Sequence, residues 1–295
     1  MKKFFDDQKL GYFLIVPSLI VISIVALFPI IYVVWLSFHK KMLIFNISEF
    51  VGLKNYAFLI NDERFWNSLF NTVYFTVISV SLEFIFGLAI ALLINRKFPG
   101  RGIVRAIILI PWAIPTVVSA KIWDWIYNGD FGVLNFVLKY FHIISSSVNW
   151  LGDRYFAIHA AIFMDVWKTT PFVALIFIAG LQIIPEDLIK AARVDGANYF
   201  YIFKKIILPI LKPVIMVILV FRTLDAFRVF DAIYVLTGGG PGNTTETLSI
   251  YAYKVLFQTL QFGYGSTISV VIFFSIMSIS FLYIRIIGKG LREFK

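Results

Sequence analysis

The chain contains no cysteine, and only 15% of its 295 residues are charged, whereas 60% are hydrophobic. The absence of cysteine excludes disulfides and thiolate sites for metals or nucleophilic catalysis. Soluble domains average roughly a quarter charged residues, so this composition is typical of a membrane protein. The three histidines, His39, His142 and His159, form no HxxxH or HExxH pattern. We therefore expect neither a zinc site nor any other metal site.

Basic residues outnumber acidic ones, and the formal net charge is +10. A net charge of this size also occurs in proteins that bind nucleic acids. Here, however, the lysines and arginines fall in short clusters between apolar segments, as membrane topology requires. We therefore expect no nucleic-acid partner.

Six apolar stretches approach or exceed the roughly 20 residues that a membrane-spanning helix needs. They predict an all-α integral membrane protein with one transmembrane domain over residues 1–295. The first stretch is too long for the core of a signal peptide, so we expect it to stay in the mature protein. The predicted spans are 10–38, 71–94, 103–127, 155–184, 207–236 and 262–285.

Lysine and arginine set the predicted orientation, because cytoplasmic loops carry an excess of both. The richer set of segments holds Lys2, Lys3, Lys9, Arg96, Lys97, Arg101, Arg105, Lys190, Arg193, Lys204, Lys205, Arg285, Lys289, Arg292 and Lys295. The poorer set holds Lys40, Lys41, Lys54, Arg64, Lys139, Arg154 and Lys254. We expect both termini to be cytoplasmic, and the loops 39–70, 128–154 and 237–254 to face outward.

The polar segment between the fourth and fifth spans has clear helix signals. Pro185 suits the first turn of a helix, and acidic Glu186 and Asp187 follow at the end that favours negative charge. Gly196 can adopt the left-handed conformation that ends a helix. We predict a short helix over 185–195 and a second one from about Asn198 into the fifth span. A helix that another protein contacts and an interfacial helix that anchors the loop both fit these signals.

Three segments form an ordered pattern that covers much of the chain. They are Lys190-Ala191-Ala192-Arg193-Val194-Asp195-Gly196-Ala197 with Phe203, Ile206 and Leu208-Pro209; Trp167 to Phe172 with Ala179-Gly180-Leu181-Gln182 and Pro185; and Phe230-Asp231 with Leu236 to Pro241. The first resembles the E-A-A-x-x-D-G-A loop of permeases from binding-protein-dependent ATP-binding cassette (ABC) importers. The other two resemble the carbohydrate-uptake branch, the maltose and glycerol-3-phosphate type permeases.

This resemblance implies a type I ABC importer permease fold in the cytoplasmic (inner) membrane, with 185–206 forming coupling helices in a cleft of a separate ATPase. It also implies three kinds of partner: a second permease subunit, two ATPase subunits and an external solute-binding protein. The residues implied in ATPase coupling are Lys190, Ala191, Ala192, Asp195, Gly196 and Ala197. Those implied in contact with the binding protein are Gly238, Gly239, Gly240 and Pro241.

Two further features of the sequence bear on the resemblance. The chain has no G-x-x-x-x-G-K-[ST] phosphate loop, so we expect ATP and magnesium to be bound by the partner ATPase and no cofactor by this chain. The family's glutamate is replaced by Lys190. This departure indicates an altered contact with the ATPase, or a second permease that is not identical and keeps the glutamate.

Nine charged residues lie in the predicted spans, where each would cost about 2.5–3.5 kcal/mol if it faced lipid. We therefore expect them to pair, to line a water-filled path or to lie near an interface. Asp165 and Lys168, three residues apart on one helix, are predicted to pair. The nine are Glu83, Lys121, Asp124, Asp165, Lys168, Arg222, Asp225, Arg228 and Asp231.

The last four of these residues are spaced by three along the predicted fifth span. Each step of three moves about 60° around a helix, so a continuous helix would not turn all four toward one ligand. We expect at least two of them to be purely structural. In the third span, Pro111 and Pro115 predict a kink, which fits either a pathway or simple packing.

A sugar offers apolar faces and hydroxyl edges, so aromatic and hydrogen-bonding side chains are candidates for its pathway. For both tryptophans among them, packing between helices is the alternative. The candidates are Trp112, Trp167, Lys168, Thr169, Arg222 and Asp225.

The predicted function is transport of a sugar or oligosaccharide by alternating access, with no enzymatic step in this chain. One alternative is glycerol-3-phosphate or a related phosphorylated polyol, which the intramembrane basic residues would favour. Another is a proton-coupled secondary transporter in which Glu83, Asp165 or Asp225 carries the proton. A membrane enzyme has less support, because no cluster of histidine and aspartate stands at a predicted membrane face.

Overall fold

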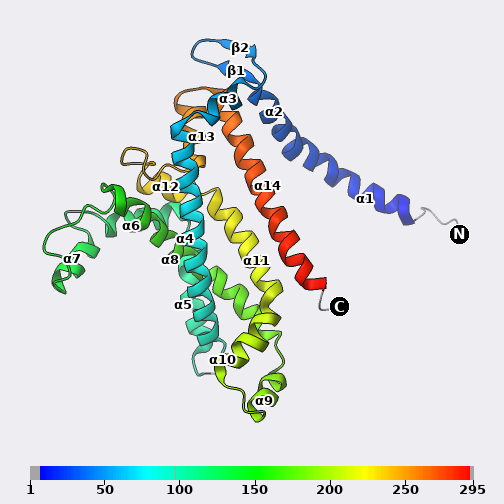
Figure 1. Ribbon diagram of the computed structural model, residues 1–295, viewed down its shortest axis with the longest axis vertical. Helices are drawn as coiled ribbons and strands as arrows, with labels where there is room; N and C mark the ends of the chain where they lie inside the picture. Colours follow the sequence, from blue (N-terminus) through cyan, green and yellow to red (C-terminus); the bar gives the residue numbers. More distant parts are fainter. Residues whose placement is uncertain (1–6, 97, 293–295) are drawn as a thin grey trace. The chain divides into compact units, whose positions relative to one another are not determined.

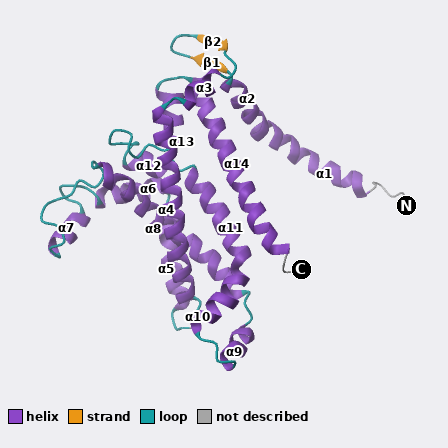
Figure 2. Cartoon of the chain, in the orientation of Figure 1, coloured by secondary structure: helices purple, strands orange, loops and turns teal. Residues whose placement is uncertain are grey.

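The computed structural model describes residues 7–96 and 98–292, and these residues form helices and a two-stranded hairpin (Figure 2). Four of the basic residues that set the predicted membrane orientation lie outside the described residues, namely Lys2, Lys3, Lys97 and Lys295. The chain falls into two compact units, Met1–Asp62 with Ala252–Phe273 and Glu63–Tyr251 with Phe274–Lys295. The single membrane domain stays a prediction.

The first unit begins with one continuous helical rod. It consists of α1 (Asp7–Ile22), a π-helical segment (Ser23–Leu27) and α2 (Phe28–Ser37). The apolar stretch Leu10–Ser37 is long enough to span a membrane, and 0% of its most apolar part is buried by the rest of the chain. A rod that is apolar all round needs lipid or another protein to cover it.

A hairpin and a short helix follow in the predicted outer loop 39–70. β1 (His39–Met42) pairs antiparallel with β2 (Ile47–Phe50), and α3 (Lys54–Ile60) comes next. The rest of this unit holds the end of α13 (Leu248–Tyr253), a π-helical segment (Lys254–Gln258) and the start of α14 (Phe262–Arg292).

The second unit contains the helices that carry the polar network described below. In it α4 packs along α8, and α11 packs against both (Figure 1). Its elements are α4 (Glu63–Ile94), α5 (Arg101–Ala113), α6 (Thr116–Ile126), α7 (Val133–Tyr140), α8 (Arg154–Gln182), α9 (Glu186–Val194), α10 (Tyr199–Ile202), a π-helical segment (Phe203–Ile207), α11 (Leu208–Phe227) and α12 (Asp231–Leu236), with the start of α13 and the end of α14.

Helix α8 is the centre of this unit. Its first turn is capped by Asp153, whose side chain accepts hydrogen bonds from the backbone N–H groups of Tyr155 and Phe156. Glycines allow the neighbouring helices to approach closely, as is common in membranes. A Cβ at Gly87 of α4 would lie 2.6 Å from Val173 of α8, and one at Gly180 of α8 would lie 2.7 Å from Val214 of α11.

The six predicted spans correspond to four long apolar helices and two bent pairs. The four are Leu10–Ser37, Glu63–Ile94, Arg154–Gln182 and Phe262–Ile286. The bent pairs are Arg101–Ala113 with Thr116–Ile126, at 91°, and Tyr199–Ile210 with Lys212–Phe227, at 66°. The second span begins eight residues before the predicted 71, since its amphipathic first turns continue the apolar helix.

Two predicted spans differ from the structure in kind. The third, 103–127, is not a kinked helix but two helices separated at Ile114, whose ψ of 134° is extended. Proline disfavours the helical conformation of the residue before it, so Pro115 accounts for the break, whereas Pro111 stays inside α5. The fifth, 207–236, ends at Phe227, and Asp231 starts a separate helix.

Candidate functional site

A buried arginine joins three helices of the second unit. Arg222 of α11 forms two hydrogen bonds to Glu83 of α4, from Nε to Oε2 at 2.5 Å and from Nη2 to Oε1 at 2.8 Å. The side chains of both residues are at most 4% exposed. Two-point pairing of this kind compensates best for the cost of removing both charges from water.

Two aspartates and a threonine extend this pair. Arg222 Nη1 lies 2.6 Å from Asp225 Oδ2, and Nη2 lies 3.3 Å from Asp165 Oδ2 on α8. The hydroxyl of Thr169 is 2.6 Å from Glu83 Oε1 and also 2.6 Å from the Asp165 carbonyl oxygen. We name Glu83, Asp165, Thr169, Arg222 and Asp225 the Arg222 network; it connects α4, α8 and α11.

The predicted pair of Asp165 and Lys168 is wrong. Asp165 pairs with Arg222 instead, because α11 brings the guanidinium against this side of α8. Lys168 Nζ donates to the backbone oxygen of Trp112 at 3.4 Å, at the end of α5. The ammonium thus meets the last turn of α5, whose carbonyls carry partial negative charge.

The Arg222 network borders a cavity of about 660 Å³. Within it, the side chains of Asp225 and Arg228 are 55% and 68% exposed, so their charged groups reach into the open space. The cavity is lined by Trp112, Thr116, Asp165, Lys168, Thr169, Phe172, Phe221, Arg222, Leu224, Asp225, Ala226, Arg228, Val229, Phe230, Asp231, Ala232 and Ile276.

The four charged residues that are spaced by three along the chain all line this one cavity, namely Arg222, Asp225, Arg228 and Asp231. This contradicts the expectation that they would not all face the same side. That expectation assumed an unbroken helix over 207–236. The helix instead ends at Phe227, and Arg228 is its C-cap. The irregular backbone at Phe230, with φ −131° and ψ −65°, redirects the chain before Asp231.

Five of the six predicted pathway residues meet at this cavity: Trp112, Lys168, Thr169, Arg222 and Asp225. The indole of Trp112 stacks on Phe172, with centroids 5.4 Å apart and planes 19° from parallel. The sixth residue, Trp167, does not line it. The indole of Trp167 packs edge-on against that of Trp123, with ring centroids 5.6 Å apart. This agrees with the alternative prediction for Trp167, packing between helices.

Glu83 and Asp165 are the members of the Arg222 network that are not among the six predicted pathway residues, and Glu83 is the more deeply buried of the two. It is the lone acidic residue in the apolar part of α4, and such a residue needs a buried partner of opposite charge. That signal was available in the sequence, but the identity of its partner, 139 positions away, was not. A second two-point pair, Arg64 to Glu246 at 2.7 and 2.8 Å, was also missed.

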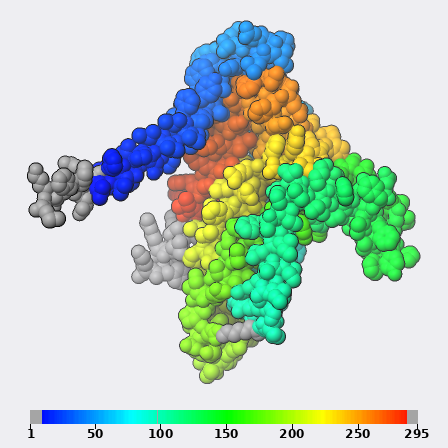
Figure 3. Space-filling model, turned by 180° about the vertical axis from the view of Figure 1, so that it is seen from behind, coloured from blue at the N-terminus to red at the C-terminus, as the bar shows by residue number. Residues whose placement is uncertain are grey.

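At the far end of α8 the chain forms an exposed bend over residues 185–206, which we name the coupling elbow (Figure 3). Helix α9 starts after Pro185, and Gly196 has a φ of +81°, so the predicted left-handed stop is confirmed. The side chain of Asn198 accepts a hydrogen bond from the backbone N–H of Tyr201 and starts the next helix as predicted.

The coupling elbow has a hollow of about 660 Å³ on its surface. Five of the six predicted coupling residues line it: Ala191, Ala192, Asp195, Gly196 and Ala197. The sixth, Lys190, instead pairs with Asp187 at 3.0 Å on the outer face of α9. Tyr201 lines the hollow, and three more residues of the coupling elbow have exposed apolar side chains, namely Val194, Tyr199 and Phe200. Clustered exposed apolar groups are typical of a contact surface.

The predicted binding-protein contacts lie in a tight loop after α12. Gly238 and Gly239 both have positive φ, 60° and 91°. Thr245 closes the loop: its hydroxyl is 2.7 Å from that of Thr237 and donates to the carbonyl of Gly240 at 2.7 Å. The loop is therefore ordered by its own hydrogen bonds, with Gly238, Gly240 and Pro241 partly exposed.

Within residues 7–96 and 98–292, no group of three or more histidine, aspartate or glutamate side chains is arranged to hold a metal ion. The carboxylates that do gather at the cavity surround the Arg222 guanidinium. The chemistry of the site is thus that of hydrogen bonds, ion pairs and an aromatic face.

Comparison with known proteins places these two sites in a family context. Residues 83–293 match the family described as binding-protein-dependent transport system inner membrane component. The trehalose/maltose transport system permease protein MalF of Thermococcus litoralis is 45% identical over 98% of this chain and 97% of its own. The trehalose transport system permease protein SugA of Mycobacterium tuberculosis is 41% identical over 96% and 90%.

Two further proteins extend the comparison. The sulfoquinovosyl glycerol transport system permease protein SmoG of Agrobacterium fabrum is 38% identical over 95% of this chain and 91% of its own. Among solved structures, a bacterial ABC transporter involved in the import of the acidic polysaccharide alginate matches with a TM-score of 0.84 at 22% identity, over 96% of both chains. This last likeness confirms the predicted type I permease fold.

Proposed function

This chain belongs to the family of binding-protein-dependent transport system inner membrane components, and from that premise we propose that it translocates a sugar or oligosaccharide through the cavity beside Arg222. The relatives named for trehalose, maltose and sulfoquinovosyl glycerol transport support a carbohydrate solute. The family is one of transport permeases. The observation that carries the proposal is the cavity itself, in which an aromatic face, a hydroxyl and several charged side chains meet within about 660 Å³.

The charges at the cavity favour a neutral solute over a phosphorylated one. Three basic side chains line it, Lys168, Arg222 and Arg228, and three acidic ones, Asp165, Asp225 and Asp231. The Arg222 guanidinium is already occupied by carboxylates on three sides. A balanced set of donors and acceptors suits hydroxyl groups, whereas a phosphate dianion would meet nearby aspartates.

The pairing of Arg222 with carboxylates also argues against proton-coupled transport through Glu83. A carboxylate that carries a proton must exchange it during the cycle, but Glu83 is held by Arg222 and Thr169 inside the protein. Protonation of Glu83 would weaken a buried two-point ion pair. Glu83 therefore serves better to hold α4, α8 and α11 together than to carry a proton.

We assign the driving force to partner subunits. The proposed assembly contains a second, non-identical permease, two ATP-binding cassette ATPases that hold ATP and magnesium, and an external solute-binding protein. The ATPases would contact the coupling elbow, whose hollow and exposed aromatic residues form a surface suited to another protein. Their closure would move α9 and α10, and with them α8 and α11, which flank the cavity.

The loop that holds Gly238, Gly239, Gly240 and Pro241 would meet the solute-binding protein. We place it outside and the coupling elbow in the cytoplasm, on the distribution of lysine and arginine. Cysteine labelling from each side of the membrane tests this orientation, because the chain has no native cysteine. A reagent that cannot cross the membrane should label Ser146→Cys, exposed in the predicted outer loop 128–154, from outside and Val194→Cys only from inside.

Uptake of labelled disaccharide into vesicles that contain the whole importer tests the cavity. Asp225→Asn removes one carboxylate but leaves Arg222 paired with Glu83, so the fold should survive. We expect the KM for solute to rise roughly tenfold or more, the scale of a hydrogen bond to a charged group. Asp124→Asn is the matched control, because Asp124 also pairs within its helix, with Lys121 at 3.1 Å, and does not line the cavity.

In that control we expect a change of less than about fivefold, as for exposed ion pairs. Equal KM values for the wild type and Asp225→Asn would place the solute elsewhere. Uptake by this chain alone, driven by a pH gradient without an ATPase, would overturn the proposed importer.

A further inference from the structure

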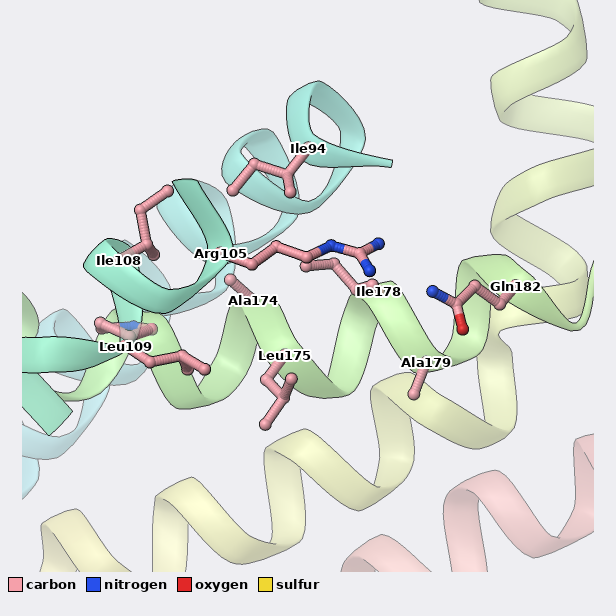
Figure 4. A pocket seen from close by; sticks show the side chains of 10 residues that line it. Ile94, Arg105, Ile108, Leu109, Ala174, Leu175, Ile178, Ala179 and Gln182 are labelled. Carbon is pink, nitrogen blue, oxygen red and sulfur yellow. The ribbon is translucent and has the colours of Figure 1, made fainter. Parts of the chain in front are cut away.

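A second hollow, of about 280 Å³, lies between α5 and α8 (Figure 4). Eight apolar residues and two polar ones, Arg105 and Gln182, form its wall. The apolar residues are Ile94, Ile108, Leu109, Pro171, Ala174, Leu175, Ile178 and Ala179. None of the ten lines the cavity beside Arg222. This hollow is therefore a separate feature, for which the transport function gives no account.

Arg105 is the unusual member of this wall. Its Nε and Nη2 atoms are buried and have no hydrogen-bond partner among the described residues. In Figure 4 the side chain extends along α8, toward the end that carries Gln182. Two guanidinium nitrogens that are shielded from water and lack an acceptor are costly, so an acceptor placed against them would be bound favourably.

The neighbouring Arg101, one helical turn earlier, differs from Arg105 because its guanidinium has hydrogen-bond partners. Arg101 Nε donates to the backbone oxygen of Ile94 at 2.9 Å, and its Nη2 lies 3.4 Å from Asn95 Oδ1. Arg101 thus ties the end of α4 to the start of α5. Because Arg105 takes no part in this connection, local structure does not explain why a guanidinium stands there.

The surroundings of the hollow indicate what the missing acceptor is attached to. Ile103 and Ile107 of α5 are 68% and 58% exposed, and Leu175 lines the hollow while being 42% exposed. In a membrane-spanning segment such residues face acyl chains. The hollow is near the lower end of the roughly 300–1,000 Å³ of small-molecule sites, enough for part of one hydrocarbon chain.

We propose that the hollow between α5 and α8 binds an anionic phospholipid, with the lipid phosphate on Arg105 Nε and Nη2 and the first part of one acyl chain against the apolar wall. The planar fork of arginine matches two phosphate oxygens. Arg105 lies one turn from Arg101, at the predicted cytoplasmic end of α5. Basic pockets between helices at that level are suited to anionic headgroups.

Native mass spectrometry of the full-length chain in detergent tests this proposal. Phosphatidylglycerol and phosphatidylcholine with identical acyl chains are added in equal amounts. The wild type should retain phosphatidylglycerol in preference to phosphatidylcholine. Arg105→Leu, which keeps the apolar stem and removes the fork, should lower the retained phosphatidylglycerol roughly fivefold or more and leave phosphatidylcholine unchanged.

Lys204→Gln is the matched control for charge. Lys204 is exposed and lies on the same predicted side of the membrane, but it does not line the hollow. This variant loses the same single charge, and we expect wild-type retention of phosphatidylglycerol. A fall equal to that of Arg105→Leu would mean that total charge, not the hollow, attracts the lipid, and would overturn the proposal.

Ala179→Phe tests the acyl part separately and remains informative if Arg105→Leu fails to fold. Ala179 lies at the exposed edge of the hollow, so a phenyl ring can fill the space without entering the buried core. We expect retained phosphatidylglycerol to fall although Arg105 is intact. Wild-type retention in Ala179→Phe would contradict the site.

A second experiment measures the thermal stability of the protein with inorganic phosphate in place of lipid. If phosphate alone raises the thermal stability of the wild type to the level reached with phosphatidylglycerol, and Arg105→Leu abolishes both effects, the ligand is a free anion and the lipid proposal fails. Stabilisation by phosphatidylglycerol only supports it.

Discussion

The Arg222 network and the coupling elbow are both rich in charge, but they hold their charges in opposite environments. In the network, Arg222 and Glu83 are almost completely buried and each is bound at two points. In the elbow, the pair Lys190 and Asp187 has side chains 67% and 92% exposed. The first arrangement contributes to the integrity of the helix bundle, whereas the second contributes little to stability and leaves its charges available to a partner.

This difference means that the same kind of substitution should have different effects in the two regions. Loss of Glu83 removes the two-point partner of a buried arginine and leaves Arg222 with the half-exposed Asp225 and the longer contact to Asp165. Loss of one partner in the elbow exchanges a weak pair for hydration, which costs about 0–1 kcal/mol. Folding should therefore respond to the network, and assembly and coupling to the elbow.

The largest effect is expected from Glu83→Ala. It removes both hydrogen bonds between Glu83 and the buried Arg222, which keeps only Asp225 and Asp165, so the cost should approach about 3 kcal/mol, the lower end of the range for a broken buried pair. We expect a large fall in the thermal unfolding temperature of the purified protein and a low yield of folded chain. The double variant Glu83→Leu with Arg222→Met, made in an Asp165→Asn background, should recover much of this loss, because no buried charge is then left without a partner.

If Glu83→Ala unfolded at the wild-type temperature, the two-point pair would not stabilise the bundle. An equally unstable double variant would show that shape, and not charge, makes this position sensitive.

Gly196→Val should have the next largest effect, on coupling and not on folding. Nothing lies within 4 Å of the added Cβ, so the strain comes from the φ of +81°, which a β-branched residue resists. A residue held in such a region costs about 1–3 kcal/mol, and the turn of the elbow should shift to relieve it. We expect membrane insertion to persist while ATP hydrolysis by the reconstituted importer no longer drives uptake.

Gly129→Val is the matched control for this prediction. Gly129 also has open space around an added Cβ, but its φ lies outside the left-handed region. We expect coupled transport in that variant. Coupled transport in Gly196→Val as well would mean that the turn conformation is not needed.

A smaller effect is expected from Asp195→Lys. Asp195 is exposed and lines the hollow of the elbow, so reversal of its charge should leave the fold unchanged. We expect weaker association with the ATPase, measured as the amount of ATPase recovered with the affinity-tagged permease. Recovery at the wild-type level would exclude this residue from the contact.

The smallest change in stability is expected from Lys190→Glu, which restores the residue typical of the family. It breaks the exposed pair with Asp187 and places two acidic side chains three residues apart, which should cost less than about 1 kcal/mol. The unfolding temperature should hardly change, whereas the affinity for the ATPase should change. A large fall in the unfolding temperature would show that the Lys190 pair is structural.

Much of the fold could be predicted from local patterns. The elbow is the clearest case, because Pro185, Gly196 and Asn198 act within a few residues of themselves, and the structure has each in a helix-starting or helix-ending role close to the one expected. The apolar stretches predicted the spans for the same reason, since length and hydropathy are properties of a single segment.

The breaks inside two of those spans could not be predicted as surely. Pro111 and Pro115 give the same local signal, but only Pro115 interrupts the helix. At Arg228 no proline or glycine marks the end of α11, yet the helix stops. The residues around these positions do not distinguish a break from a continuous helix, because proline is tolerated inside α5 and is absent where α11 ends.

The sequence by itself determined that this is a membrane permease with an exposed polar segment between its fourth and fifth spans, since composition, helix signals and the ordered family pattern are all read along the chain. Only the tertiary structure decided which charges share a site. Arg222 pairs with Glu83 and Asp165, 139 and 57 positions away, in addition to Asp225 on its own helix. Such choices depend on which faces of distant helices meet, and no short stretch of residues carries that information.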